Sequence, residues 1–99
     1  MTDGIDLNVF DMTDRRVLIT GAAGGIGSAM ARSFSAHGAT LVLADRNQTS
    51  LDELALSVGG NPPCLGYDQS IPAEVEKLAA KAGPIDILLN NAGILAMSP

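Results

Sequence analysis

Short apolar runs alternate along this chain with stretches in which apolar residues recur every three or four positions. The runs are Val17–Ile19, Leu41–Ala44, Cys64–Tyr67 and Ile85–Leu89. Continuous apolar runs of this length, rich in branched residues, are typical of strands buried in a parallel sheet. The stretches between them have the periodicity of helices that pack one face on a core. The pattern therefore predicts alternating strands and helices.

Three helices are predicted, and turn-forming residues indicate where they begin and end. The first ends before Gly38, Thr49 or Ser50 caps the second, Gly59 ends it, and Ser70 caps the third. The faces expected to be buried are, in chain order, Ile26, Met30 and Phe34, beside Ala29 and Ser33; Leu51, Leu54, Ala55 and Val58; and Ile71, Val75, Leu78, Ala79 and Ala82. Each set fits one side of a helix.

The predicted order is β-α-β-α-β-α-β, and right-handed crossovers arrange such a chain as a parallel sheet with helices on both faces. This is the first part of a Rossmann-type, doubly wound α/β fold, incomplete after its fourth strand. We expect residues 1–14 to be an irregular leader whose apolar Leu7, Val9, Phe10 and Met12 pack against the sheet edge. Residues 15–99 are then the N-terminal part of a dinucleotide-binding domain.

Composition narrows the class of protein. The chain has 99 residues, enough for one small domain, and 46% of them are hydrophobic, as in a globular protein. Its 11 acidic and 6 basic side chains give a net charge of −5, which argues against nucleic-acid and anionic-membrane partners. No apolar stretch has the length of a membrane span, the N-terminus lacks a secretory signal, and the single Cys64 excludes an internal disulfide and a multi-cysteine metal site. We expect a soluble, cytoplasmic protein.

The segment Thr20–Gly27 joins the first strand to the first helix and has the form of a phosphate-binding turn. Gly21 permits a tight turn, Gly25 leaves the backbone open to a pyrophosphate, and Gly27 lets the helix approach the strand. The helix N-terminus then offers free N–H groups to the phosphates. A P-loop is excluded because Gly27 is followed by Ser28 rather than by Lys.

Asp45 ends the second strand, where a carboxylate can accept hydrogen bonds from both hydroxyls of an adenosine ribose and repel a 2′-phosphate. This favours NAD over NADP. Its neighbour Arg46 can bind a 2′-phosphate, lie over the adenine or be a solvated surface charge. The alternative for Asp45 is a residue of a strand-end turn or a helix cap.

At this point the chain resembles the short-chain dehydrogenase/reductase family. Thr20–Gly27 matches that family's Thr-Gly-x-x-x-Gly-x-Gly motif, and Asn90-Asn91-Ala92-Gly93 matches its second signature, after the fourth strand. The resemblance covers about residues 10–99. It implies that Gly21, Gly25, Ile26 and Gly27 contact the pyrophosphate and the nicotinamide side, and that Asp45 binds the ribose.

The same resemblance implies roles for residues after the later strands. Asp68 contacts the adenine amino group, Gln69 helps through its backbone, and Asn90 steadies the sheet near Thr20. Ala92 and Gly93 line the adenosine ribose, and Asn91 beside them belongs to the expected cofactor site. The basic residue typical of NADP users is replaced by Gly24, in agreement with Asp45. For Asp68 the alternative is a cap on the turn before Ser70.

The catalytic residues of that family are not found in the chain, and no metal ligands are expected. Its members act on alcohols and carbonyls through a Tyr-x-x-x-Lys pair and a Ser. The single Tyr67 has Ile71, not Lys, four positions later, and we expect it to be a core or sheet-face aromatic. Ser98 follows the fourth strand, outside the family's catalytic strand. For a full-length protein the resemblance implies an alcohol or ketone substrate and a homo-oligomer.

Three functions compete. In the first, the chain is the N-terminal fragment of an NAD(P)-dependent oxidoreductase and carries only its cofactor site. The strand Ile85–Leu89 supports this interpretation: it is almost wholly apolar, and in an open four-stranded sheet it would lie exposed along an edge. The second is a non-catalytic dinucleotide-binding module or scaffold. The third, a methyltransferase that binds S-adenosylmethionine, predicts a different glycine loop and gives no role to Asn90–Gly93.

Overall fold

The computed structural model of the chain describes residues 11–91, and its elements follow the predicted alternating order. They are β1 (Arg16–Thr20), α1 (Gly25–Ala36), β2 (Thr40–Asp45), α2 (Gln48–Val58), β3 (Cys64–Gly66), α3 (Pro72–Ala82) and β4 (Ile87–Asn90). The strand boundaries agree with the apolar runs to within two residues, and Tyr67 lies just beyond the end of β3. Leu7, Val9 and Phe10 lie outside the described residues.

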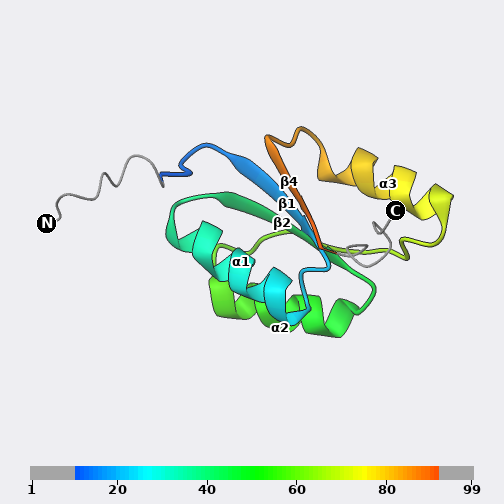
Figure 1. Cartoon of the computed structure of the whole chain (residues 1–99), viewed down its shortest axis with the longest axis horizontal. Coiled ribbons are helices and arrows are strands. Elements are labelled where there is room, and N and C mark those ends of the chain that lie inside the picture. The colour runs from blue at the N-terminus through cyan, green and yellow to red at the C-terminus, as the bar shows by residue number, and fades with distance from the viewer. Residues whose placement is uncertain (1–10, 92–99) are drawn as a thin grey trace, which may run out of the picture.

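All four strands are parallel, in the order β3-β2-β1-β4. The chain adds strands on one side of β1 and then crosses over to place β4 on the other side. Figure 1 shows that α1 and α2 cover one face of the sheet whereas α3 covers the opposite face. This is the predicted doubly wound, Rossmann-like arrangement, and the strand order reverses between β1 and β4.

Alternate residues of the two central strands build two separate cores. Val17 and Ile19 of β1 pack with Leu43 of β2 under α1 and α2, and all three are fully buried. Leu18 and Val42 point to the other face and pack with Leu78 of α3. Because both faces of β1 and β2 are covered, both strands read as continuous apolar runs in the sequence.

The predicted buried face of α1 is partly wrong. Ile26 is 63% exposed, and the buried residues are Gly27 and Ala31. Met30 and Phe34 are half-buried and pack against the core, as expected. The small residues let the α1 backbone lie close to the sheet, and Ile26, in the first turn, projects beyond the core.

Two predicted caps are also wrong. The side chain of Asn47, not that of Thr49 or Ser50, caps α2 by accepting the Ser50 N–H at 3.0 Å. The N-cap of α3 is Ile71, and its side chain makes no capping bond. Within residues 11–91, no helix combines the length and apolarity needed to cross a bilayer.

β4 lies at the edge of the described sheet, and its α3 side is open. Among residues 11–91 its only strand neighbour is β1, and Leu88 is 58% exposed. On α3, Leu78 and Ala82 are buried, but Ile71, Val75 and Ala79, which were predicted to be buried, are exposed. The apolar face of α3 is therefore longer than the part of the sheet beneath it.

Arg16 ties the amino end of β1 to the connection between α3 and β4. Its guanidinium donates from Nε to the Pro84 carbonyl and from Nη2 to the Ala82 carbonyl, both at 2.7 Å. Its backbone N–H donates to Asp86 Oδ2 at 2.8 Å. Because α3 ends at Ala82, the guanidinium satisfies a carbonyl that has no partner within the helix.

Candidate functional site

The turn after β1 brings the start of α1 into close contact with the strand. Gly21 has φ +65°, the left-handed region that favours glycine. A Cβ built on Gly27 would lie 2.2 Å from the Gly21 carbonyl oxygen and 2.8 Å from Ala22 Cα. No side chain fits at that distance, so position 27 requires glycine for packing, as the sequence predicts.

The N-terminus of α1 is open to solvent. Its N-cap, Gly24, provides no side-chain hydrogen bond. The first three N–H groups of the helix, on Gly25, Ile26 and Gly27, have no carbonyl available one turn earlier within the helix. A Cβ on Gly25 would have nothing within 4 Å. Free donors, the positive end of the helix dipole and open space above Gly25 are the requirements for holding a phosphate.

Asp45, at the end of β2, links the glycine turn to the second strand. Its Oδ2 accepts the Ala23 N–H at 3.0 Å, and its Oδ1 accepts the Arg46 N–H at 2.6 Å. Asp45 thus also belongs to a strand-end turn, the alternative left open by the sequence. Oδ1 also accepts the Asn47 N–H, at 3.4 Å, whereas within residues 11–91 the Ala23 N–H is the one partner of Oδ2. Because each carboxylate oxygen has two lone pairs, Oδ2 keeps one for a hydroxyl donor, and on Oδ1 a ribose hydroxyl would replace the long Asn47 bond.

A cavity of about 270 Å³, which we call the carboxyl-edge pocket, lies where β1, β2 and β3 end. It is lined by Gly21, Gly24, Asp45, Arg46, Tyr67, Gln69 and Asn91. The structure thus brings together five of the predicted cofactor residues: Gly21, Asp45, Arg46, Gln69 and Asn91. Gly25 and Ile26 lie at the neighbouring helix start and Gly27 beneath it, whereas Ala92 and Gly93 are outside the described residues.

Asp68 is predicted as an adenine contact but does not line this pocket. Its Oδ1 accepts the Ser70 hydroxyl at 2.7 Å and the Ser70 N–H at 2.9 Å. These hydrogen bonds lower the pKa of Asp68, and the charge of Arg46 lowers it further. Asp68 therefore caps the turn that contains Ser70, which is the alternative role considered from the sequence. Ser70 therefore donates its hydrogen bonds to Asp68 and does not cap α3.

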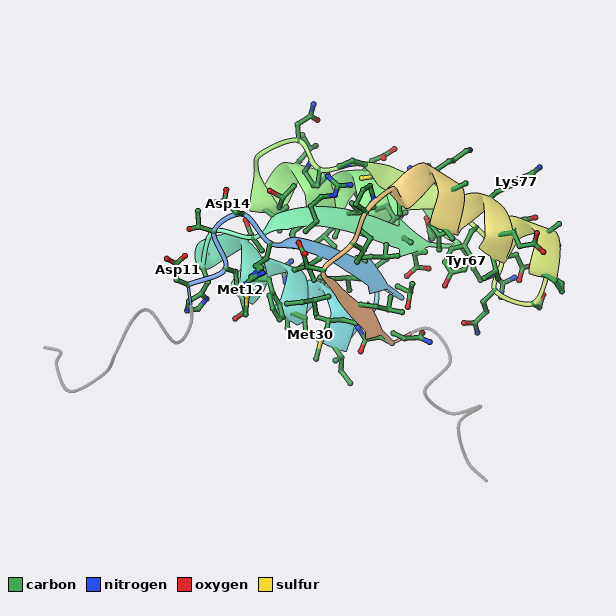
Figure 2. The ribbon with its side chains drawn as sticks, turned by 90° about the horizontal axis from the view of Figure 1, so that it is seen from above. Asp11, Met12, Asp14, Met30, Tyr67 and Lys77 are labelled. Carbon is green, nitrogen blue, oxygen red and sulfur yellow. The ribbon has the colours of Figure 1, made fainter. Side chains whose placement is uncertain are left out.

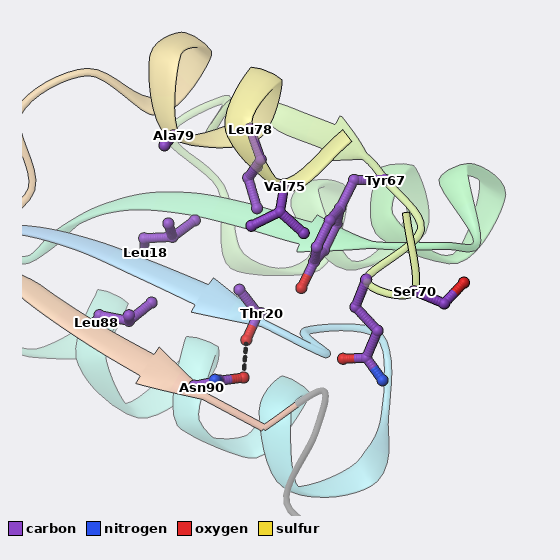
Figure 3. A pocket seen from close by; sticks show the side chains of 10 residues that line it. Leu18, Thr20, Tyr67, Ser70, Val75, Leu78, Ala79, Leu88 and Asn90 are labelled. Atoms are coloured by element: carbon purple, nitrogen blue, oxygen red, sulfur yellow. Dashed lines mark hydrogen bonds between the residues drawn. The ribbon is translucent and has the colours of Figure 1, made fainter. Parts of the chain in front are cut away.

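The ends of β1 and β4 are joined by side chains, as the resemblance implies for Asn90. Thr20 Oγ1 donates to Asn90 Oδ1 at 2.9 Å, a bond drawn in Figure 3. The Asn91 N–H donates to the Thr20 carbonyl at 3.2 Å, and its side-chain amide contacts Met30 Sδ at 3.7 Å. Asn90 thus holds the two strands where their order reverses.

Tyr67 is a pocket residue that the sequence did not indicate. It is 9% exposed, as expected of a core aromatic, yet it lines the carboxyl-edge pocket. In Figure 2 it lies between the sheet and α3, whereas Lys77 points away from the sheet. Burial raises the pKa of Tyr67, a hydrogen bond with Thr20 lowers it, and the charge of Asp45 raises it. Its position one residue after a strand was the available signal.

No metal centre or reactive thiol is found in the described part of the chain. Residues 11–91 contain no group of three or more His, Cys, Asp or Glu placed to hold a metal ion. Burial raises the pKa of the Cys64 thiol, and the nearby Asp52 raises it further, which disfavours the thiolate needed for nucleophilic attack. The helix start and the carboxyl-edge pocket offer hydrogen-bond donors, acceptors and open space that can bind a ligand.

Comparisons with known proteins agree with this geometry. A family model for short chain dehydrogenases matches residues 15–99. Meso-2,3-butanediol dehydrogenase of Serratia marcescens is 47% identical over 83 residues, which are 79% of this chain and 33% of that protein. D-threitol dehydrogenase of Mycolicibacterium smegmatis is 35% identical over 109 aligned positions, which cover 100% of this chain and 42% of that protein.

A solved structure extends the likeness to a protein with its cofactor. The 3-ketoacyl-(acyl-carrier-protein) reductase of Brucella melitensis, complexed with NADH, superposes with a TM-score of 0.74 and 32% identity, over 79% of this chain and 34% of that chain. The chain thus spans about a third of the length of the first relatives it matches. With 85 of its 99 residues inside the family model, the chain belongs to the short chain dehydrogenase family.

Proposed function

We propose that this chain is the N-terminal, cofactor-binding part of an NAD(P)-dependent oxidoreductase that moves a hydride between a secondary alcohol or ketone and a nicotinamide. One observation carries the proposal: the open N-terminus of α1 and the Asp45 carboxylate flank the same carboxyl-edge pocket. Parallel α/β sheets bind ligands in the crevice at the carboxyl ends of their strands, and the reversal between β1 and β4 creates that crevice.

The donor set fits a dinucleotide whose phosphates lie at the start of α1 and whose adenosine enters the pocket. Gly25 leaves open space for a pyrophosphate, and the free N–H groups of the first helical turn supply its hydrogen bonds. Asp45 accepts hydrogen bonds from the ribose hydroxyls, and Gln69 and Asn91 provide amide groups on the adenosine side. The cofactor supplies the hydride chemistry, and these residues bind and orient it.

The cofactor that we propose is NAD rather than NADP. A 2′-phosphate on the ribose would meet the Asp45 carboxylate at close range and be repelled. Gly24, on the other side of the pocket, brings no compensating positive charge. Arg46 also lines the pocket, and we assign its guanidinium to the pocket rim, where it can lie over the adenine.

A binding experiment tests this assignment. NAD and NADP are titrated calorimetrically against the protein and against Asp45→Ala. Loss of two hydrogen bonds to a charged acceptor predicts that Asp45→Ala weakens NAD binding about tenfold or more and narrows its preference over NADP. Arg46→Ala is the comparison: because its guanidinium is assigned to the adenine side that NAD and NADP share, we expect the ratio of NAD to NADP affinity to stay within about twofold of that of the natural protein. An unchanged preference in Asp45→Ala would remove the basis for the choice of NAD.

Two further measurements test the class of function. S-adenosylmethionine is titrated in parallel, because tight binding of that ligand in place of NAD would favour a methyltransferase. The coding sequence beyond codon 99 is read for a Ser and a Tyr-x-x-x-Lys motif in frame. Their presence supports the oxidoreductase, and a genuine stop codon would favour a non-catalytic binding module.

A further inference from the structure

Tyr67 lies at the junction between the end of β3 and the proposed nucleotide site. Its backbone N–H donates to the Asp45 carbonyl at 3.1 Å, so its place is tied to the residue that ends β2. Its ring packs with Leu18, Val42 and Leu78 in the core beneath α3. One face of the ring is therefore anchored, and its position is set independently of any ligand.

Tyr67 borders two cavities. On one side is the carboxyl-edge pocket of about 270 Å³. On the other is an apolar cavity of about 550 Å³, which we call the α3 groove; Leu18, Leu78 and Leu88 line it. Tyr67 and Gln69 are the two residues common to both linings among those that the structure describes. Gln69 is exposed and Tyr67 is buried, so the fixed part of the partition is the phenol ring.

The orientation of the ring agrees with this role. Figure 3 shows the Tyr67 hydroxyl directed toward the end of β1, where Thr20 bonds to Asn90. The ring spans the space between β3 and β1 above β2, and Val75 and Leu78 of α3 lie beside it. A shorter side chain at position 67 would open the carboxyl-edge pocket into the α3 groove.

We propose that Tyr67 is a contact residue for the adenosine part of the bound nucleotide, and that its ring forms the wall that closes the carboxyl-edge pocket against the α3 groove. The inference rests on the proposed function, because it places the nucleotide in that pocket. In this inference Tyr67 strengthens the binding of the adenosine that NAD and NADP share, whereas Asp45 sets the preference between the two cofactors. The two residues therefore affect different quantities.

A protein consisting of residues 1–99 offers a direct readout. Tyr67 is the one Tyr of the sequence, which has no Trp, so its emission dominates the intrinsic fluorescence of residues 1–99. Adenosine diphosphate ribose is titrated into the protein, and a tyrosine amide solution is titrated in parallel to correct for absorption by adenine. Direct contact predicts a saturable change in tyrosine emission with the same midpoint as the calorimetric titration.

Variants separate the ring from the hydroxyl. Tyr67→Phe keeps the wall, and we expect affinity for adenosine diphosphate ribose within about twofold of the natural protein. Tyr67→Leu opens the wall, and we expect binding about fivefold to tenfold weaker, with an unchanged ratio of NAD to NADP affinity. Val75→Ala is the matched control, because Val75 lines the α3 groove but not the carboxyl-edge pocket. It should bind as the natural protein does.

The outcomes distinguish this inference from the function beneath it. Calorimetric binding, a change in tyrosine emission and weaker nucleotide binding by Tyr67→Leu would together support both the inference and the proposed function. Calorimetric binding with unchanged emission, or equal weakening by Val75→Ala, overturns the inference and leaves the proposed function intact. Absence of binding to the folded natural protein overturns both. If circular dichroism shows that Tyr67→Leu does not fold, the emission titration and Tyr67→Phe test the inference instead. No change in tyrosine emission, or a tenfold loss of affinity for adenosine diphosphate ribose in Tyr67→Phe, would overturn the proposed role of the ring.

Discussion

Replacing Gly27 by Ala tests the close approach between α1 and the turn after β1. The added Cβ would lie 2.2 Å from the Gly21 carbonyl oxygen, 0.8 Å inside the 3.0 Å limit of real contacts. The opposing atoms belong to the backbone of Gly21 and Ala22, so the strain is relieved only if the turn or the helix moves. Overpacking of this kind costs up to about 3 kcal/mol, and the better helix propensity of Ala recovers about 1 kcal/mol.

We therefore expect Gly27→Ala to lower the free energy of unfolding by about 2 kcal/mol, which is a fall of roughly 10 °C in Tm for a domain of this size. Urea unfolding followed by far-ultraviolet circular dichroism measures the change. The slope of free energy against urea should stay constant, because the variant alters the native contact rather than the surface exposed on unfolding. A Gly27→Ala protein as stable as the natural one would refute the close-approach argument.

Gly25→Ala is the matched control in the same turn. Its Cβ would have nothing within 4 Å, so we expect stability equal to or slightly above that of the natural protein. Nucleotide binding should nevertheless weaken, because the methyl group occupies the space proposed for the pyrophosphate. The two glycines should thus separate, with stability lost at Gly27 and binding lost at Gly25. Equal effects of both variants on stability would contradict this division.

Two further predictions concern features away from the pocket. Arg16→Ala removes the guanidinium bonds to the Ala82 and Pro84 carbonyls and should lower the free energy of unfolding by about 1–2 kcal/mol, with Arg16→Lys intermediate. Urea unfolding measures both variants, and a change below about 0.5 kcal/mol for Arg16→Ala would contradict a stabilising role for these two hydrogen bonds. The lowered pKa of Asp68 implies a small stabilisation that is present above about pH 4 and is lost as pH falls through the pKa of the folded state. Asp68→Asn should therefore reduce the fall in the free energy of unfolding at acid pH, and an unaltered dependence of that free energy on pH would contradict this role of Asp68.

The sequence predicted the strands better than it predicted the helix faces. β1 and β2 are covered on both sides, so their apolar runs have a single interpretation. The buried face of a helix depends on where the helix lies on the sheet. Ile26 fits the period of α1 but lies beyond the core, and Val75 fits that of α3 but lies over the open groove beside β4. Periodicity carries no information about either displacement.

The same distinction applies to the candidate site. The glycine spacing and Asp45 were predictable because a tight turn, a close approach and a strand-end carboxylate are local requirements. The position of Tyr67 depends on which cavities lie on the two sides of its ring, and those depend on how β3 and α3 meet. Asp68 was assigned from the family pattern, yet its carboxylate is engaged by Ser70, a neighbour two residues away.

The placement of β4 has a consequence for the order in which the sheet is completed during translation. Thr20 pairs with Asn90, 70 residues later, whereas it pairs with Ala44 after only 24. The ribosome adds about 5–20 residues per second, so β1 waits roughly 4–14 s after its own synthesis for its second neighbour. Until β4 arrives, the side of β1 that faces away from β2 is an unpaired edge. A nascent chain of this protein is therefore most exposed to wrong strand pairing along β1.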